Sequence, residues 1–308
     1  MTKMIDINHI SYHYPGQKKP VFSDFSLTLT EGRVYGLLGK NGTGKSTLLH
    51  LIAGLLRPQQ GWVCFSPDKT SQWDAPDRAT WLRRPEVLGE LFLVSEDFEL
   101  PAITLHDYVQ LLLPFYPRFS RDVLNSCLEA FELPQQMNLG QLSMGQKKKA
   151  YMSIALAANT RVLLMDEPTN GLDIPSKSQF RKVVARCMSD DRLIIVSTHQ
   201  VHDVEQLLDH ILILANPDGD SPIPLSRRQR RAGGLLLNAS VADLTDRYVF
   251  EVRQPGQLDD TLIYAEPSLQ GNIVMARRDE GQAETLVNLE LLFNAVTKGL
   301  VKTNGLNG

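Results

Sequence analysis

The stretch with the strongest chemical signal is residues 39–47, which read GKNGTGKST. It fits the phosphate-binding pattern G-x-x-x-x-G-K-[ST]. Glycines in such a loop let successive backbone N–H groups turn toward phosphate oxygens, while one lysine and one hydroxyl complete the cradle. A glycine-rich surface turn, the simpler interpretation, would not need this spacing. The candidate nucleotide-binding residues are Gly39, Asn41, Gly42, Gly44, Lys45, Ser46 and Thr47.

This pattern is informative only between a strand and a helix. Residues 34–38 read VYGLL and predict a short buried strand before the loop. Apolar residues then recur at helical spacing over 48–56, until Gly54 and Pro58 end the run. The predicted helix would point its N-terminus, with free N–H groups and partial positive charge, at the place where phosphates sit.

Two adjacent carboxylates, Asp166 and Glu167, follow an apolar run at 162–165 that predicts another buried strand. Paired acids at a strand end repel each other and lose hydration, so a purely structural role would be costly. A magnesium ion and a catalytic water would give each one a task. Residues 193–198 predict a further strand that ends on His199. A strand-end histidine is commonly structural, but the polar groups clustered at one sheet edge favour a functional one.

Residues 142–146, LSMGQ, open a predicted helix that runs to Ala158. Ser143 is a good N-cap residue, and the free N–H groups of this helix end suit an anion. An ordinary capped helix is the alternative. Tyr14 stands just before a turn at Pro15, where its ring could stack on a nucleotide base or could be a half-buried strand tyrosine.

The composition limits the classes of protein. A chain of 308 residues with 43% hydrophobic content can form one large and one small globular domain. A net charge of −3 provides no basic surface for general nucleic-acid binding, so we expect no nucleic-acid partner. The three cysteines form no C-x-x-C pair and favour reduced thiols in the cytosol. No signal peptide and no apolar run of roughly 20 residues is evident. A membrane function would therefore need another chain.

Taken together, these residues resemble the ATP-binding cassette (ABC) family, the nucleotide-hydrolysing subunits of ABC transporters. The resemblance covers about residues 1–215 and follows the family's motif order: Walker A at 39–47, the signature at 142–146, Walker B at 162–168, the D-loop at 170–173 and the switch residue His199. It implies an α/β fold: a P-loop NTPase core of ABC type with a mixed sheet, flanking helices, an antiparallel β edge and a helical insertion at about 98–158.

The resemblance implies ATP and Mg²⁺ as cofactors. Within one chain, Lys45 and the loop amides would hold the β- and γ-phosphates, while Ser46 and Asp166 would hold magnesium. Glu167 would polarise the attacking water and His199 would contact the γ-phosphate. Tyr14 would stack on adenine.

A second subunit would complete the site. In the resembled family two cassettes meet head to tail, in a homo- or heterodimer. The residues that would face the partner subunit or its nucleotide are Ser143, Gly145, Gln146 and Asp173.

Two positions depart from the family pattern. Met144 takes the place of the first glycine of the usual LSGGQ, although Ser143 and Gly145 remain. The family's Q-loop glutamine should fall at Ser95, whose hydroxyl is too short to reach the metal and water, and Glu96 is the candidate substitute.

The chain after residue 215 has no catalytic motif. Residues 216–234 predict a flexible hairpin or linker, in which the arginines between Arg227 and Arg231 form a solvated basic turn or contact anionic lipid. Residues 235–308 predict an accessory α+β domain, which resembles that of bacterial ABC exporter ATPases and favours packing or dimerisation.

The leading hypothesis is a cytoplasmic ATPase on the inner face of the membrane. It would dimerise on ATP and drive a separately encoded membrane permease, with export favoured over import. The alternative is a soluble ABC ATPase that acts on ribosomes or nucleic acid. A single cassette and the short separation of Lys45 from Asp166 argue against that alternative, and Glu167 with His199 argues against a non-hydrolysing regulatory partner.

Overall fold

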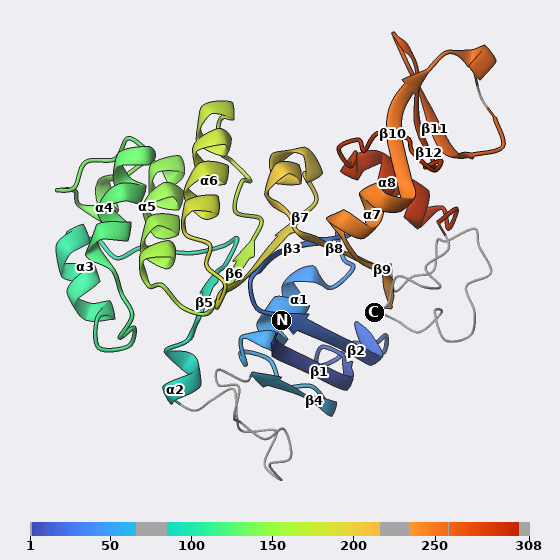
Figure 1. The fold of residues 1–308 in the computed structure, drawn as a ribbon. Helices are drawn as coiled ribbons and strands as arrows, with labels where there is room; N and C mark the ends of the chain where they lie inside the picture. Colours follow the sequence, from blue (N-terminus) through green and yellow to red (C-terminus); the bar gives the residue numbers. More distant parts are fainter. Residues whose placement is uncertain (1, 66–84, 216–233, 258, 302–308) are drawn as a thin grey trace.

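The computed structural model describes residues 2–65, 85–215, 234–257 and 259–301 (Figure 1). The expected hairpin or linker, with its arginine run, lies outside the described residues except for Gly234.

The strands are β1 (Lys3–Tyr12), β2 (Phe22–Thr30), β3 (Arg33–Leu38), β4 (Gln60–Phe65), β5 (Leu91–Val94), β6 (Val162–Asp166), β7 (Leu193–Thr198), β8 (His210–Leu214), β9 (Leu235–Ser240), β10 (Tyr248–Arg253), β11 (Leu262–Ser268) and β12 (Gly271–Arg277). The α-helices are α1 (Lys45–Ile52), α2 (Pro85–Leu88), α3 (Leu105–Leu112), α4 (Arg121–Ala130), α5 (Met144–Ala157), α6 (Ile174–Arg186), α7 (Val241–Arg247) and α8 (Leu289–Thr297).

The central sheet has six strands in the order β5-β6-β7-β3-β8-β9. All neighbours pair in parallel except β8 and β9, which are antiparallel. Strands β3, β6 and β7 read as nearly continuous apolar runs because both faces of the sheet are covered. Their carboxyl ends meet at one edge, where ligands bind in open α/β sheets.

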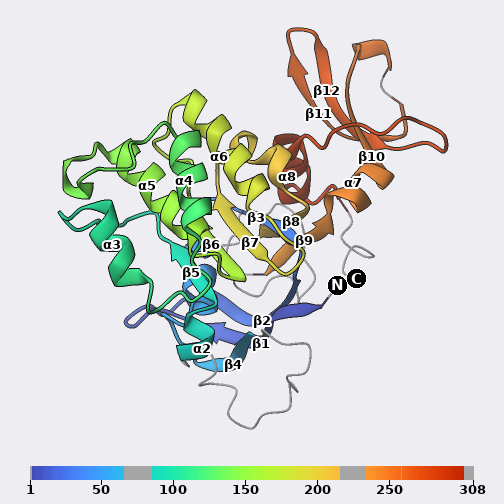
Figure 2. The ribbon, with the colours of Figure 1, turned by 60° about the vertical axis from the view of Figure 1, so that its left-hand side comes forward.

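The two faces of this sheet carry separate apolar clusters. In β7, Ile194 and Val196 join the cluster under the helices, whereas Leu193 and Ile195 join the cluster shared with α1 and the first strands. Figure 2 shows α4, α5 and α6 on one side, and the antiparallel sheet β2-β1-β4 on the other. The expected α/β core, with its antiparallel edge, is confirmed.

The helices α3, α4 and α5 form a lobe at one end of the sheet (Figure 1). Side-chain caps start them: Thr104 Oγ1 accepts from the Asp107 amide at α3, and Ser120 Oγ accepts from the Val123 amide at α4. The segment that joins α3 to α4 contains both Pro114 and Pro117, which cannot continue a helix.

Helix α1 is shorter than the sequence predicts. It ends at Ile52, and Gly54 adopts a left-handed φ of 70° just beyond it. Beyond the helix Leu55 is 63% exposed, whereas Leu56 is partly buried against the apolar cluster of α1 and the first strands. The glycine ends the helix earlier than the spacing of the leucines suggests.

The last part of the chain is joined to the main sheet. Strand β9 pairs with β8, so the residue at which we expect the accessory region to begin, 235, is also the first residue of a strand in the central sheet. After α7 the chain forms the antiparallel sheet β10-β12-β11. Leu292 of α8 belongs to the same apolar cluster as Val196 of β7. No helix in the described ranges is both long and apolar enough to cross a bilayer.

Candidate active site

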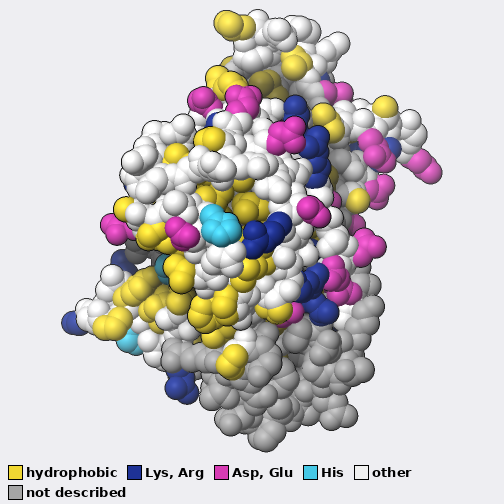
Figure 3. Space-filling view, turned by 90° about the vertical axis from the view of Figure 1, so that its left-hand side faces the viewer, with side chains coloured by type: hydrophobic (Ala, Val, Ile, Leu, Met, Phe, Trp, Pro, Cys, Tyr) yellow, Lys and Arg dark blue, Asp and Glu magenta, His cyan; other side chains and the backbone are white. Residues whose placement is uncertain are grey.

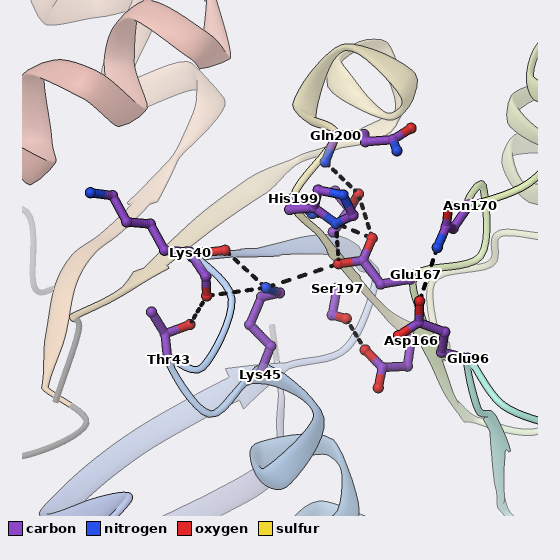
Figure 4. Close-up of polar contacts among 12 residues, drawn as sticks. Lys40, Thr43, Lys45, Glu96, Asp166, Glu167, Asn170, Ser197, His199 and Gln200 are labelled. Atoms are coloured by element: carbon purple, nitrogen blue, oxygen red, sulfur yellow. Dashed lines mark hydrogen bonds and ion pairs between the residues drawn. The ribbon is translucent and has the colours of Figure 1, made fainter. Parts of the chain in front are cut away.

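A cavity of about 550 Å³ opens at the carboxyl edge of the central sheet. The loop after β3 forms one wall, and the segments after β6 and β7 form the other (Figure 4). The predicted site residues that line it are Tyr14, Asn41, Gly42, Gly44, Lys45, Ser46, Thr47, Glu167 and His199. These nine residues come from four separate parts of the sequence, Tyr14, the loop at 41–47, Glu167 and His199, and they share one cavity.

Gly44 shows why this loop needs glycine. It caps α1 in a left-handed conformation with φ of 95°. A Cβ there would also lie 2.7 Å from a methyl group of Val21 and 3.0 Å from the ring of Phe22. Any other residue would strain the turn and push it away from the first strands. The free N–H groups of α1 therefore stay directed at the cavity.

Lys45 is the buried cation of the cavity, with 7% of its surface exposed. Its Nζ donates to the carbonyl oxygen of Gly39 at 2.8 Å and lies 3.9 Å from Oε1 of Glu167. Burial lowers the pKa of Lys45, and the nearby Glu167 and Asp166 carboxylates oppose that shift. The ammonium group lies between the loop that would hold phosphates and the carboxylates.

Glu167 is held at both carboxylate oxygens. His199 Nδ1 lies 2.8 Å from Oε1, and Thr198 Oγ1 donates to Oε2 at 3.1 Å. The neighbouring Asp166 carboxylate accepts a hydrogen bond from Ser197 Oγ (Figure 4). The two adjacent acids are thus separated into different environments by the polar end of β7, which lies beside β6. Glu167 faces the cavity while Asp166 is tied to the sheet.

Tyr14 lines the cavity beside the phosphate loop. Its hydroxyl lies 3.0 Å from Oγ1 of Thr47, and its ring meets that of Tyr12 edge-on at 5.2 Å. These contacts fix the ring at the end of the cavity formed by the first strands. The assignment to adenine stays a prediction.

Gly39 and Asp166 are not among the residues that line this cavity, and four further candidates lie outside it at the starts of α5 and α6. Ser143 caps α5 in a capping box: its Oγ accepts from the Gln146 amide at 3.3 Å, and Gln146 Oε1 accepts from the Ser143 amide at 3.0 Å. A Cβ on Gly145 would meet nothing within 4 Å. Asp173 caps α6 by accepting from the Ser176 amide. A hydrogen bond from the Ser176 side chain, and secondly the one from its amide, lower the pKa of Asp173.

The two candidates for the Q-loop position, Ser95 and Glu96, differ in their place relative to the cavity. Glu96 lines the cavity, and its Oε1 accepts from Nδ2 of Asn170 at 2.9 Å. Ser95 is not among the lining residues. The sequence pattern placed the glutamine position at Ser95, one residue short of the side chain that reaches the cavity. Asn170, which the motif pattern places only in the D-loop, also lines the cavity.

Lys148 is a residue that the sequence did not single out. It is 6% exposed, and its Nζ donates to the carbonyl oxygens of Glu167 and Asn170. Because three successive lysines are typical of a solvated helix face, the burial of Lys148 was not expected from the sequence. Its position relative to later apolar residues could have indicated this burial. Met152 and Ala155 follow Lys148 at helical intervals and are fully buried, so Lys148 lies on the inner face of α5.

Residues 22–170 match the family model described as ABC transporter. Cobalt import ATP-binding protein CbiO of Rhodobacter capsulatus is 31% identical over 253 residues, which cover 79% of this chain and 88% of that protein. The chain belongs to the ABC transporter ATP-binding family. As a member, it binds ATP and is an ATPase coupled to transport.

Other comparisons agree with this ABC ATPase assignment. Zinc uptake system ATP-binding protein ZurA of Listeria innocua is 27% identical, over 69% of this chain and 82% of that protein. The solved structure of cbiO1 from Clostridium perfringens, part of the ABC transporter complex cbiONQ, has a TM-score of 0.56 at 21% identity. It covers 77% of this chain and 88% of that one, and it supports the fold alone.

The donor set of the ABC ATPase fits magnesium. Ser46 offers a hydroxyl and Asp166 a carboxylate, and Mg²⁺ prefers hard oxygen ligands. Within the described ranges, no group of three or more His, Cys, Asp or Glu side chains could hold a metal ion.

Proposed function

We propose that this ABC ATPase dimerises on ATP and drives a separately encoded membrane permease. The observation that carries the proposal is the division of the candidate residues. Lys45, Glu167 and His199 line one cavity, whereas Ser143 and Gly145 stand outside it at the start of α5, the part of that helix that is not buried. Such a division suits a site that a second subunit completes.

We propose the following roles within one subunit. Lys45 and the amides of the phosphate loop hold the β- and γ-phosphates, and Tyr14 stacks on adenine. Ser46 and Asp166 would hold Mg²⁺, which neutralises phosphate charge when bound. Glu167 accepts a proton from the attacking water, because its carboxylate faces the cavity and is already oriented by two donors. His199 contacts the γ-phosphate and keeps Glu167 in place.

The partner subunit would add its signature helix. Ser143 and Gly145 at the N-terminus of α5 provide free N–H groups for the γ-phosphate of the opposite nucleotide. Met144 between them is 68% exposed, so the departure from the family pattern lies where a partner would cover it. Gln146 and Asp173 would lie at the same interface. In a homodimer each subunit would present these residues to the nucleotide of the other.

We assign the permease contact to the lobe of α3 and α4. Figure 3 shows that apolar side chains gather on this face of the molecule. Leu111 is 61% exposed and Phe115 is 68% exposed, and a cavity of about 640 Å³ opens beside α3 and α4. An apolar exposed surface of this kind fits a segment of a membrane protein. Binding there would place the subunit on the inner face of the membrane.

The direction of transport stays a prediction. We expect export from the resemblance of residues 235–308 to exporter ATPases. The two relatives above carry uptake or import names, which favour the opposite direction. Uptake of a labelled cargo by inside-out vesicles would support export, and uptake by right-side-out vesicles would support import.

Replacing Glu167 with Gln tests the proposed function. The variant keeps the size of the side chain but cannot accept the proton, so we expect hydrolysis to fall about 10² to 10⁴-fold. ATP affinity should stay within about threefold, and ATP should trap the variant as a dimer in gel filtration. Wild-type hydrolysis by Glu167→Gln would overturn the assignment of the base. Co-sedimentation with ribosomes rather than membranes would instead support the soluble alternative.

A further inference from the structure

Lys148 is a buried cation that touches the backbone of the proposed base. Its Nζ donates to the carbonyl oxygen of Glu167 at 2.7 Å and to that of Asn170 at 2.8 Å. It is 6% exposed and does not line the nucleotide cavity. The side chain therefore acts on the loop between β6 and α6 and does not reach a ligand in that cavity.

The backbone that Lys148 holds is unusual. Glu167 has a φ of 45°, in the left-handed region that side chains other than glycine rarely adopt. Such a conformation persists only where the surroundings enforce it, and it is typical of functional sites. The carboxylate of Glu167 is fixed from β7 by Thr198 and His199. Its carbonyl is fixed from α5 by Lys148, so both ends of the residue are held.

Asn170 extends this arrangement to the segment after β5. Its carbonyl accepts from Lys148, and its Nδ2 donates to Glu96. Burial lowers the pKa of Lys148, and the Glu96 and Glu167 carboxylates oppose the shift. One ammonium group thus joins α5, the loop after β6 and, through Asn170, the loop after β5.

We propose that Lys148 is a positioning residue for ATP hydrolysis. It holds the two carbonyls so that the backbone at Glu167 keeps its left-handed turn and the carboxylate keeps facing the cavity. The inference rests on the proposed role of Glu167 as the base. Because α5 begins with the signature residues, Lys148 links the helix that would face the partner's nucleotide to the base of its own site.

Lys148→Met tests this directly, because methionine has a similar length and no donor. The matched control is Lys147→Met, since Lys147 is its neighbour on α5 and bonds to neither carbonyl in the described part of the chain. We expect Lys148→Met to lower kcat about 10- to 100-fold while KM and the ATP Kd change less than about threefold. Lys147→Met should match the wild type. Lys148→Gln, which restores a donor, should recover part of kcat.

A double variant separates positioning from general damage. If Lys148 acts through Glu167, its loss should cost less than about threefold in the Glu167→Gln background, measured by single turnover with excess enzyme. Equal losses in both backgrounds, or a loss of ATP binding as large as the loss of kcat, would overturn the inference. If Lys148→Met does not fold, the same comparison with Lys148→Gln decides. Wild-type activity of the Glu167→Gln variant would instead contradict the role of Glu167 as the base. That outcome is distinct from a failure of the role proposed for Lys148.

Discussion

His202 and Glu290 join the loop after β7 to the last helix, with Nε2 of the histidine 2.7 Å from Oε2 of the glutamate. A second contact joins the same two segments: the backbone amide of Leu289 donates to Oε1 of Glu205 at 2.6 Å. The loop that carries His199 is therefore tied at two points to α8.

The first prediction concerns the pH dependence of this contact. The hydrogen bond to Glu290 raises the pKa of His202, with further attraction from Glu205 and with burial opposing. A raised pKa in the folded state gives stability that is complete below the unfolded value of about 6.5 and is lost as pH rises through the folded value. We expect His202→Gln to melt about 1 °C lower than wild type at pH 6, and at the same temperature at pH 9. Paired thermal melts check this, and a difference that grows with pH would contradict it.

The second prediction concerns ATP binding. Lys45→Ala removes the ammonium group that we propose binds the phosphates, so ATP affinity should fall roughly 10- to 100-fold. Lys40→Ala is the control, because Lys40 lies in the same loop but is exposed and points away from the cavity (Figure 4). Equilibrium binding of a fluorescent ATP analogue measures both. Unchanged affinity in Lys45→Ala would count against the phosphate-loop assignment.

The third prediction separates two roles of His199. Asn places an amide nitrogen near the position of Nδ1 and can still donate to Glu167, whereas Ala cannot. If orientation of Glu167 is a main task of His199, His199→Asn should keep at least tenfold more hydrolysis than His199→Ala, which should lose about 10- to 100-fold. Steady-state phosphate release gives the comparison. Equal losses would assign the main task to the γ-phosphate contact.

The fourth prediction tests the second half of the site. Gly145 faces open space, so Gly145→Asp should leave the fold of one subunit intact. In a dimer the new carboxylate would face the partner's γ-phosphate and repel it. In the Glu167→Gln background we expect Gly145→Asp to abolish ATP-dependent dimerisation, with ATP affinity and melting temperature unchanged. Gly145→Ala is the matched small change, and a stable ATP dimer of the Asp variant would contradict the proposed interface.

The α/β core and most of the cavity could be predicted because local patterns determine them. The mostly apolar run at residues 193–198 predicts a strand buried on both faces. The residues of the phosphate loop are neighbours along the chain, and they line the same cavity in the structure. The sequence could not show which of two neighbouring side chains extends into the cavity. Ser95 and Glu96 are adjacent, and only the path of the chain after β5 decides which one faces the cavity.

The C-terminal part shows a second limit. Its strands and last helix follow from alternating and helical patterns, but their partners do not. Nothing local in 235–240 indicates that this strand pairs with β8 rather than with its own neighbours. Leu286 and Leu289 have helical spacing, but α8 begins at Leu289, after the Asn288 cap, and Leu286 is 84% exposed.

The strand order of the central sheet also bears on how the protein is made. β3, which leads into the phosphate loop, lies between β7 and β8, so Arg33 pairs with Leu193 and Tyr35 with His210. Contacts between residues so distant along the chain form slowly and cannot form at all until both have left the ribosome. A nascent chain that ends before β7 would have the complete phosphate-loop sequence, but β3 would lack both of its neighbours in the central sheet. ATP binding should therefore begin abruptly during synthesis, after β8 emerges.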